Sequence, residues 1–499
     1  MSTAYQQLLE RFRELHRFAH LEAICHWDQS TMMPSGSNEA RSEALAELAL
    51  MQHRRLTAPE VGDWIAQADG EVLAPLEQAN LREMKRHWQQ AIALPDDLVE
   101  AQSLAGARCE HAWREQRRSN DWRGFSGNLR EVVRLCREEA DVRSAARGGG
   151  RYDSLLDLYE PGMTRARLDA LFAEIGGWLP DLCQRVIERQ SSDTCLSPVG
   201  PFPTDAQRKL GLEVMSALGF DFDRGRLDVS VHPFCGGAPE DVRITTRYSE
   251  DDFSGSLMGV IHETGHGCYE QNLPPGWLGQ PAGEARSMGV HESQSLLFEM
   301  QLARHPAFLH WIAPRLLDAF GHEGQSQALA PDNLQKLFTR VQPGLIRVDA
   351  DEVTYPFHII LRYEIECGLI EGELEVEDIP ELWNEKMEAW LGLSTRGNYR
   401  DGCMQDIHWT DGSFGYFPTY TLGAIYAAQL FAALEREIEG LEQHIRDGNF
   451  VALTCWLREK IWLQGSLLET DELLRQATGD SPDPDWLRRH LERRYLAVD

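Results

Sequence analysis

The segment Gly259–Glu270, with the sequence GVIHETGHGCYE, contains the residues best suited to chemistry. His262 and His266 are four residues apart, so on a helix they lie one turn apart on the same face. Each imidazole can therefore direct a nitrogen at one metal ion. Glu263 follows the first histidine, where its carboxylate lies beside the metal and can accept a proton from a water molecule without binding the ion itself. The pattern predicts a metal-binding helix suited to hydrolysis.

A catalytic zinc site normally has three protein ligands and leaves one position for water. The turn-forming segment 274–283 is rich in Pro and Gly, and a new helical pattern begins near Glu284. This second helix can pack against the first and bring a third ligand to the metal. It carries His291 and Glu292, which as neighbours cannot face the same way on one helix. The spacing alone does not decide which of the two is the ligand.

Five short motifs occur in order along the chain. They are Asp241–Thr245 (DVRIT), His262–His266 (HETGH), His291–Leu297 (HESQSLL), Ile346–Asp351 (IRVDAD) and Gly402–Trp409 (GCMQDIHW). In these motifs, and through nearly its whole length, the chain resembles the carboxypeptidase Taq family of metallocarboxypeptidases. The resemblance implies that Glu292 is the third ligand. It also implies a homodimer and a site that holds Zn²⁺ or, because the family can use it, Co²⁺.

A carboxypeptidase must recognise the free C-terminal carboxylate of its substrate. A planar, bidentate arginine suits that task, and the family motifs contain two, Arg347 and Arg243. The alternative for each is a structural salt bridge with a nearby aspartate, Asp349 or Asp241. We expect one of the two arginines to bind the substrate carboxylate, and the sequence does not decide which.

Four further residues receive roles from the resemblance. Gln405, Asp406 and His408 are expected at the closed end of a substrate groove, where they limit how far a peptide enters. Tyr420 and His408 are the candidates for a side-chain donor to the negative oxygen of the tetrahedral intermediate. Ordinary aromatic packing is the alternative for Tyr420.

The apolar pattern predicts a mainly helical chain with a very small antiparallel sheet next to the metal helix. Leu227 and Val229 alternate with polar residues before a turn region at 233–239, and Val242 and Ile244 alternate after it, which favours a β-hairpin. The resemblance implies one domain over residues 1–499, with two lobes flanking a deep groove. Helical periodicity covers 4–24, a helix from Ser37 onward, 72–93, 96–119, 126–145, 166–190, 286–303, 332–341, 353–372, 379–392, 420–446, 451–462 and 485–495.

Composition excludes several classes of function. The formal net charge is −30, from 79 acidic against 49 basic residues, which argues against nucleic-acid binding. No apolar run reaches the length of a membrane span, and the first residues lack the basic start and apolar middle of a signal peptide. The ten cysteines are scattered without a CxxC pair, as is typical of reduced thiols in the cytosol. We therefore expect a cytoplasmic protein without membrane or nucleic-acid partners.

The hypothesis that combines these observations is a metal-dependent carboxypeptidase. Such an enzyme would hydrolyse the last bond of peptides that have a free C-terminus, using water activated by the metal and Glu263 as the general base. An endopeptidase or dipeptidase with the same metal site is the nearest alternative. A metal-binding interaction protein without turnover is another, but Glu263 disfavours it because a structural zinc site has no use for an unbound carboxylate there.

Overall fold

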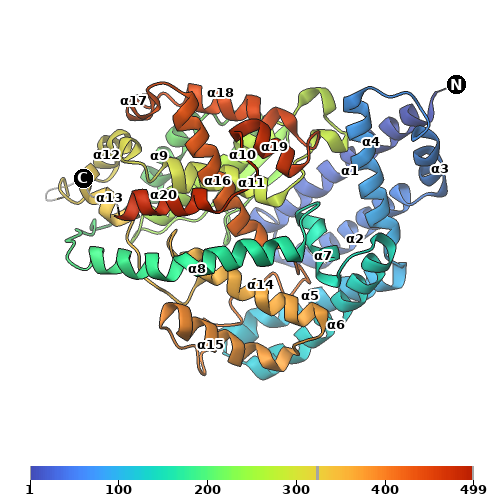
Figure 1. Ribbon diagram of the computed structural model, residues 1–499, viewed down its shortest axis with the longest axis horizontal. Coiled ribbons are helices and arrows are strands. Elements are labelled where there is room, and N and C mark those ends of the chain that lie inside the picture. The colour runs from blue at the N-terminus through green and yellow to red at the C-terminus, as the bar shows by residue number, and fades with distance from the viewer. Residues whose placement is uncertain (1, 322–324, 497–499) are drawn as a thin grey trace.

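The computed structural model describes residues 2–321 and 325–496, and helices dominate it (Figure 1). No helix of the described part is both long and apolar enough to cross a membrane. The helices are α1 (Ala4–Thr31), α2 (Asn38–Leu56), α3 (Pro59–Ala68), α4 (Pro75–Ala93), α5 (Asp96–Arg118), α6 (Trp122–Arg147), α7 (Arg151–Tyr159), α8 (Arg165–Gln190), α9 (Thr204–Ala217), α10 (Ser254–Gln271), α11 (Met288–Leu296), α12 (Pro306–Phe320), α13 (Pro331–Phe338), α14 (Tyr355–Glu371), α15 (Ile379–Leu391), α16 (Pro418–Glu437), α17 (Leu441–Arg446), α18 (Val451–Lys460), α19 (Thr470–Thr478) and α20 (Asp485–Leu496).

The prediction of a mainly helical chain with a very small sheet is confirmed, although single helices differ from it. The predicted helix 420–446 is two helices, because Gly440 between α16 and α17 adopts a left-handed conformation with φ of +70°. Helix α1 continues to Thr31 rather than ending near residue 26, since no proline interrupts it before Pro34. The pattern analysis missed α3, α7, α9, α12 and α19.

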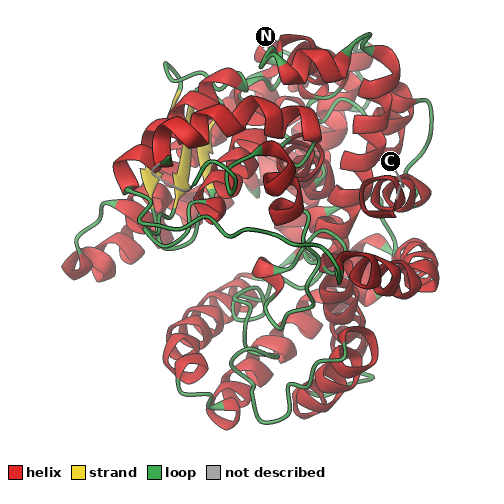
Figure 2. Cartoon of the chain, turned by 90° about the vertical axis from the view of Figure 1, so that its left-hand side faces the viewer, coloured by secondary structure: helices red, strands yellow, loops and turns green. Residues whose placement is uncertain are grey.

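The sheet is mixed, so the predicted hairpin between the two alternating segments is wrong. Strands β1 (Gly225–Val229) and β3 (Asp241–Thr246) run parallel, and β2 (Cys235–Ala238) pairs antiparallel with the other edge of β3. The region taken for a turn therefore contains a strand of its own. Only Pro239 and Glu240 separate β2 from β3, which leaves β1 to pair on the free side of β3. The three strands lie together at one side of the helical array (Figure 2).

The central strand β3 positions helix α10, which carries the HETGH motif. Val242 and Ile244 of β3 are completely buried, and α10 packs across this part of the sheet. Gly267 of α10 permits the approach, because a Cβ atom there would lie 2.8 Å from Cδ1 of Ile244. A larger residue at this position would push α10 away from the strand that supports it.

Most apolar side chains belong to one large core formed by α5 to α20 and the sheet, and α1, α3 and α4 enclose a smaller one. Polar contacts join the two cores. Asn80 of α4 donates to Gln280 Oε1 at 3.3 Å and accepts from the backbone amide of Ala282 at 3.1 Å. The single domain with two lobes and a groove, expected for residues 1–499, stays a prediction.

Glu83 of α4 adds an ionic link between the two parts. Its side chain is fully buried and pairs with Arg82 and Arg86 at 2.7 Å each and with Arg286, just before α11, at 3.0 Å. Burial by itself would raise the pKa of Glu83, but Arg286 and Arg86 outweigh burial and lower this pKa to about 2. The N-terminal helices are therefore held to the segment that leads into α11 by an ionised carboxylate.

This cluster predicts an acid-dependent loss of stability. The folded-state pKa of Glu83 lies below the unfolded value, so its stabilisation is complete above the unfolded pKa and is lost as the pH falls from about 5 toward 2. Glu83→Gln should lower the free energy of unfolding at pH 7 by about 3 kcal/mol, as urea unfolding would measure. The difference from the wild type should shrink on acidification.

The matched control is Glu10→Gln, because Glu10 is exposed and has no ion pair within the described residues. That variant should match the wild type at every pH. An equal loss at pH 7 and pH 3 for Glu83→Gln would contradict the assignment to an ionised Glu83.

Candidate active site

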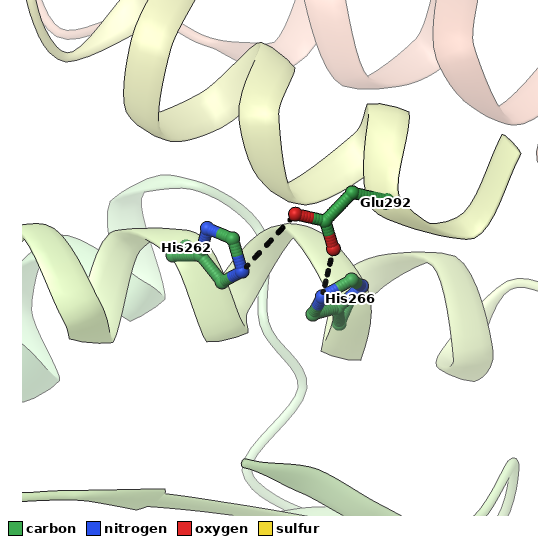
Figure 3. A group of neighbouring side chains, drawn as sticks. All are labelled: His262, His266 and Glu292. Carbon is green, nitrogen blue, oxygen red and sulfur yellow. Dashed lines mark ion pairs between the residues drawn. The ribbon is translucent and has the colours of Figure 1, made fainter. Parts of the chain in front are cut away.

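Three side chains converge on one point between α10 and α11 (Figure 3). His262 Nε2 lies 3.9 Å from Glu292 Oε1, and His266 Nε2 lies 3.4 Å from Glu292 Oε2. One ligand atom from each residue falls within 4.8 Å of the other two. The side chains retain 12–22% exposure, so solvent reaches them. Two imidazoles and a carboxylate are a donor set suited to catalytic zinc, and these are the three residues that the sequence and the resemblance had singled out.

Two glycines let the helices approach closely enough for this convergence. A Cβ atom on Gly265, within the HETGH motif, would lie 2.4 Å from the carbonyl oxygen of Gln294 on α11. A Cβ atom on Gly423 of α16 would lie 2.7 Å from Cγ of Glu292. Figure 1 shows α10, α11 and α16 close together in the middle of the molecule. Glu292 therefore reaches the site because both neighbouring helices lack a side chain where α11 passes.

The other ring nitrogens of both histidines have partners that the sequence analysis did not assign. His262 Nδ1 lies 3.0 Å from Glu299 Oε2, and His266 Nδ1 lies 3.1 Å from the carbonyl oxygen of His291. Such contacts orient metal-binding histidines and fix the proton on Nδ1, which leaves Nε2 free to bind a metal. The spacing could have indicated Glu299, because a residue seven positions after Glu292 on a helix lies near the same face.

His291 is the residue that competed with Glu292 as third ligand, and its side chain turns elsewhere. Its Nε2 lies 2.8 Å from Glu270 Oε1, and its Nδ1 lies 2.7 Å from His266 Nδ1. Both ring nitrogens are thus engaged behind His266. The structure places His291 beside the group of three rather than within it.

Glu263 is buried, and within the described residues it forms no hydrogen bond or ion pair. Burial is the main cause that raises the pKa of its carboxyl to about 7. It follows His262 on α10, and its carboxyl interacts electrostatically with both His262 and Glu292. A buried carboxyl without a structural partner in this position is chemically available.

Arg347 lies in a buried cluster of polar groups. Its Nε donates to Asp406 Oδ1 and its Nη1 donates to the hydroxyl of Tyr355, both at 2.9 Å. Burial would lower the pKa of Arg347, but Tyr355 and Asp406 reverse this effect and raise it. Within the described residues no partner satisfies Nη2. One edge of this guanidinium is therefore held in place while another nitrogen is open to a ligand.

Gln405 and Asp406 support Arg347 from behind. The second oxygen of Asp406 accepts from Nε of Arg362 at 2.7 Å, and Arg362 and Arg347 hold the pKa of Asp406 well below its usual range despite burial. Gln405 accepts from the backbone amide of Arg347 at 2.7 Å and donates to three carbonyl oxygens. Arg347 thus pairs with Asp406 and not with Asp349, which is exposed.

Tyr420 and His408 meet beside this cluster. Tyr420 precedes Gly423 by three residues on α16, so it faces the same side as the glycine that packs on Glu292. Its hydroxyl lies 3.1 Å from His408 Nε2, and its ring lies 5.0 Å from the guanidinium of Arg347. Burial lowers the pKa of His408 to about 4, so this imidazole is neutral. His408 Nδ1 is buried without a partner in the described residues.

Arg243 lies on β3 and makes a different set of contacts. Its Nε and Nη2 donate to both oxygens of Asp241, at 3.0 and 2.8 Å, which is the structural salt bridge considered from the sequence. The guanidinium also stacks 4.2 Å from the ring of Trp27 in α1. The fork of Arg243 is therefore occupied by protein groups.

Comparisons with known proteins agree over the full length. The sequence pattern of the carboxypeptidase Taq (M32) metallopeptidase family matches residues 7–495. Thermostable carboxypeptidase 1 of Thermus thermophilus is 42% identical, with 99% of each chain covered. Among solved structures, Trypanosoma cruzi metallocarboxypeptidase 1 is 48% identical with a TM-score of 0.97, and a Pyrococcus furiosus carboxypeptidase is 32% identical with a TM-score of 0.93; each comparison covers 99% of both chains. The chain belongs to the carboxypeptidase Taq (M32) family and is a metallocarboxypeptidase.

Proposed function

We propose that this enzyme hydrolyses the C-terminal bond of peptides with a zinc ion held by His262, His266 and Glu292. The convergence of these three side chains is the observation that carries the proposal. Bound there, zinc would polarise the scissile carbonyl and lower the pKa of a water ligand to about 7. The same nitrogen and oxygen donors also accept cobalt, which is the alternative ion.

Glu263 is the proposed general base. It accepts a proton from the attacking water and delivers it to the nitrogen of the departing amino acid. Its lack of a structural partner supports this role, because a carboxylate already committed to an arginine would be a poor proton acceptor. The neighbouring position on α10 keeps it within reach of the water without making it a ligand.

Arg347 is the proposed binding residue for the substrate carboxylate. Its open Nη2 can donate to that carboxylate while Asp406 and Tyr355 keep the guanidinium in place. Arg243 is the weaker candidate, because Asp241 occupies its fork. Gln405 and Asp406, expected from the resemblance to meet substrate directly, are assigned here to positioning Arg347.

Tyr420 is the proposed donor to the oxyanion of the tetrahedral intermediate, which is worth on the order of 3 kcal/mol in well-placed cases. Neutral His408 supports it. If His408 carries its proton on Nε2, it donates to the Tyr420 oxygen and leaves the hydroxyl hydrogen free for the substrate. The buried Nδ1 without a partner agrees with this tautomer.

The class of peptidase, the oligomeric state and the cellular location are separate from the chemistry of the site. An endopeptidase or dipeptidase could use the same metal ligands, and the requirement for a free substrate carboxylate separates it from a carboxypeptidase. The homodimer and the cytoplasmic location stay predictions.

Replacing the general base should abolish turnover without removing the metal. Glu263→Gln preserves size but cannot accept the proton, so kcat should fall by about 10²- to 10⁴-fold. Zinc content by elemental analysis should equal that of the wild type. Equal peptide turnover in the two proteins would refute the role of Glu263.

Replacing Arg347 should weaken the preference for a free C-terminus. Arg347→Lys keeps the charge but loses the planar fork, so kcat/KM for a free-acid peptide should fall by about 10- to 100-fold, as for a lost charged hydrogen bond. The poor cleavage of the C-terminally amidated peptide should hardly change. Arg396→Lys, at an exposed arginine, is the control. If Arg243→Lys erases the preference and Arg347→Lys retains it, the two assignments are reversed.

Filling the space beside Glu292 should weaken metal binding. In Gly423→Ala the new methyl group collides with the Glu292 side chain, and overpacking of this kind costs about 1–3 kcal/mol. We expect the Kd for zinc, measured by chelator competition, to rise by about tenfold or more. Gly259→Ala is the control, because a Cβ atom at that position on α10 would have no atom of another element within 4 Å. Unchanged zinc affinity in Gly423→Ala would contradict this account of how Glu292 is placed.

A further inference from the structure

Helix α11 continues into an uncommon π-helical segment, Leu297–Leu302 (η4). The backbone amide of Ala303 donates to the carbonyl oxygen of Phe298, five residues earlier, at 2.9 Å. Such segments are rare and frequently occur at functional sites. Here the segment carries Glu299, the carboxylate that contacts Nδ1 of His262.

Glu299 is held from two sides. One oxygen accepts from Nη2 of Arg304 at 3.0 Å, and the other lies 3.0 Å from Nδ1 of His262. Its geometry therefore depends on where η4 places its backbone. A displacement of η4 would move Glu299, and His262 would lose the contact that orients its ring.

The end of η4 is capped by a residue distant in sequence. Arg494 of α20 donates through Nη1 to the carbonyl oxygen of Met300 and through Nη2 to that of Gln301, the latter at 2.9 Å. The last carbonyls of a helical segment have no partner within the segment, so one planar guanidinium satisfies two of them. The side chain of Arg494 is only 8% exposed, which makes this a buried and specific contact.

A second anchor fixes α20 itself. Glu352, just after the IRVDAD motif, accepts from Tyr495 at 3.0 Å and from Arg494 Nη1 at 3.1 Å, and it lies 2.6 Å from Nε2 of His490. These three partners all come from α20. Arg494 thus joins helix α20, which Glu352 anchors, to the end of η4, the segment that carries Glu299.

We propose that Arg494 is a positioning residue for the metal site, which it controls by locking the end of η4 and so holding Glu299 against His262. This inference rests on the proposed metal site. It extends the support of the site from α11 to a helix almost two hundred residues later in the sequence. The partners of Arg494 are Met300, Gln301 and Glu352, and none of them is one of the three side chains proposed to bind the metal.

The test measures zinc affinity rather than activity. Removal of a group that orients a metal ligand typically costs 10- to 100-fold in affinity, so Glu299→Ala should raise the Kd for zinc within that range. Arg494→Ala should raise it in the same direction by about tenfold. The double variant should show less than the product of the two single effects, because both act on one contact.

Two control variants separate this role from general stability. Arg493→Ala removes an exposed arginine of α20 that pairs with Glu435 and should leave zinc affinity unchanged. Leu491→Ala damages the packing of α20 through a fully buried side chain and should lower the Tm of the metal-free protein without weakening zinc binding. Affinity is measured well below the Tm of each variant.

Any of three results would overturn the proposal. The first is an unchanged Kd for zinc in Arg494→Ala, and the second is full additivity of the effects of Arg494→Ala and Glu299→Ala on zinc affinity. The third is a loss of zinc affinity in Leu491→Ala equal to that in Arg494→Ala. If Arg494→Ala does not fold, Arg494→Lys, which can reach one carbonyl at a time, replaces it with an expected smaller rise in Kd. Glu292→Ala is the separate check on the metal site: if zinc binding survives in that variant, the proposed metal site is wrong.

Discussion

The structure depends on the close packing of three helices, α10, α11 and α16, around one carboxylate. Gly265 and Gly423 remove the side chains that would keep these helices apart. Glu292 then reaches the two imidazoles that one turn of α10 presents on a single face. Protein interiors are packed so densely that one additional methyl group is felt. The candidate metal site is therefore a consequence of helix packing as much as of ligand chemistry.

Around this contact the protein keeps several buried charged groups. Arg347 shares Asp406 with Arg362, Glu299 lies between Arg304 and His262, and Glu352 gathers three partners from α20. Burying an ion is costly unless its partners satisfy it fully. Each of these carboxylates lies against at least one arginine, and this pairing offsets part of the cost of burial. The same networks link the site to segments distant in sequence. A buried charge is stable only when an opposite charge lies beside it, so these segments must pack together.

Glu366 of α14 gives a further case in which a buried acid organises the site. It accepts from Trp409 at 2.8 Å and from the backbone amide of Gly415 at 3.1 Å, and burial raises its pKa to about 7. The loop between these two residues follows directly after His408. The loop that follows His408 is therefore anchored to α14 by this carboxyl group.

Local sequence determined helix α10 and the pairing of His262 and His266 on it, because residues four apart on a helix lie on the same face. It also gave Glu263 as the candidate general base. Apolar periodicity gave most long helices, and the family resemblance supplied Glu292. Tertiary structure alone decided the rest. It made the sheet mixed, since the direction of a strand depends on its pairing across space. It placed Asp406 rather than Asp349 beside Arg347. It also brought Arg494 to the end of η4, the segment that carries Glu299. A spacing rule holds only within one element, whereas these contacts join segments whose separation in sequence carries no geometric information.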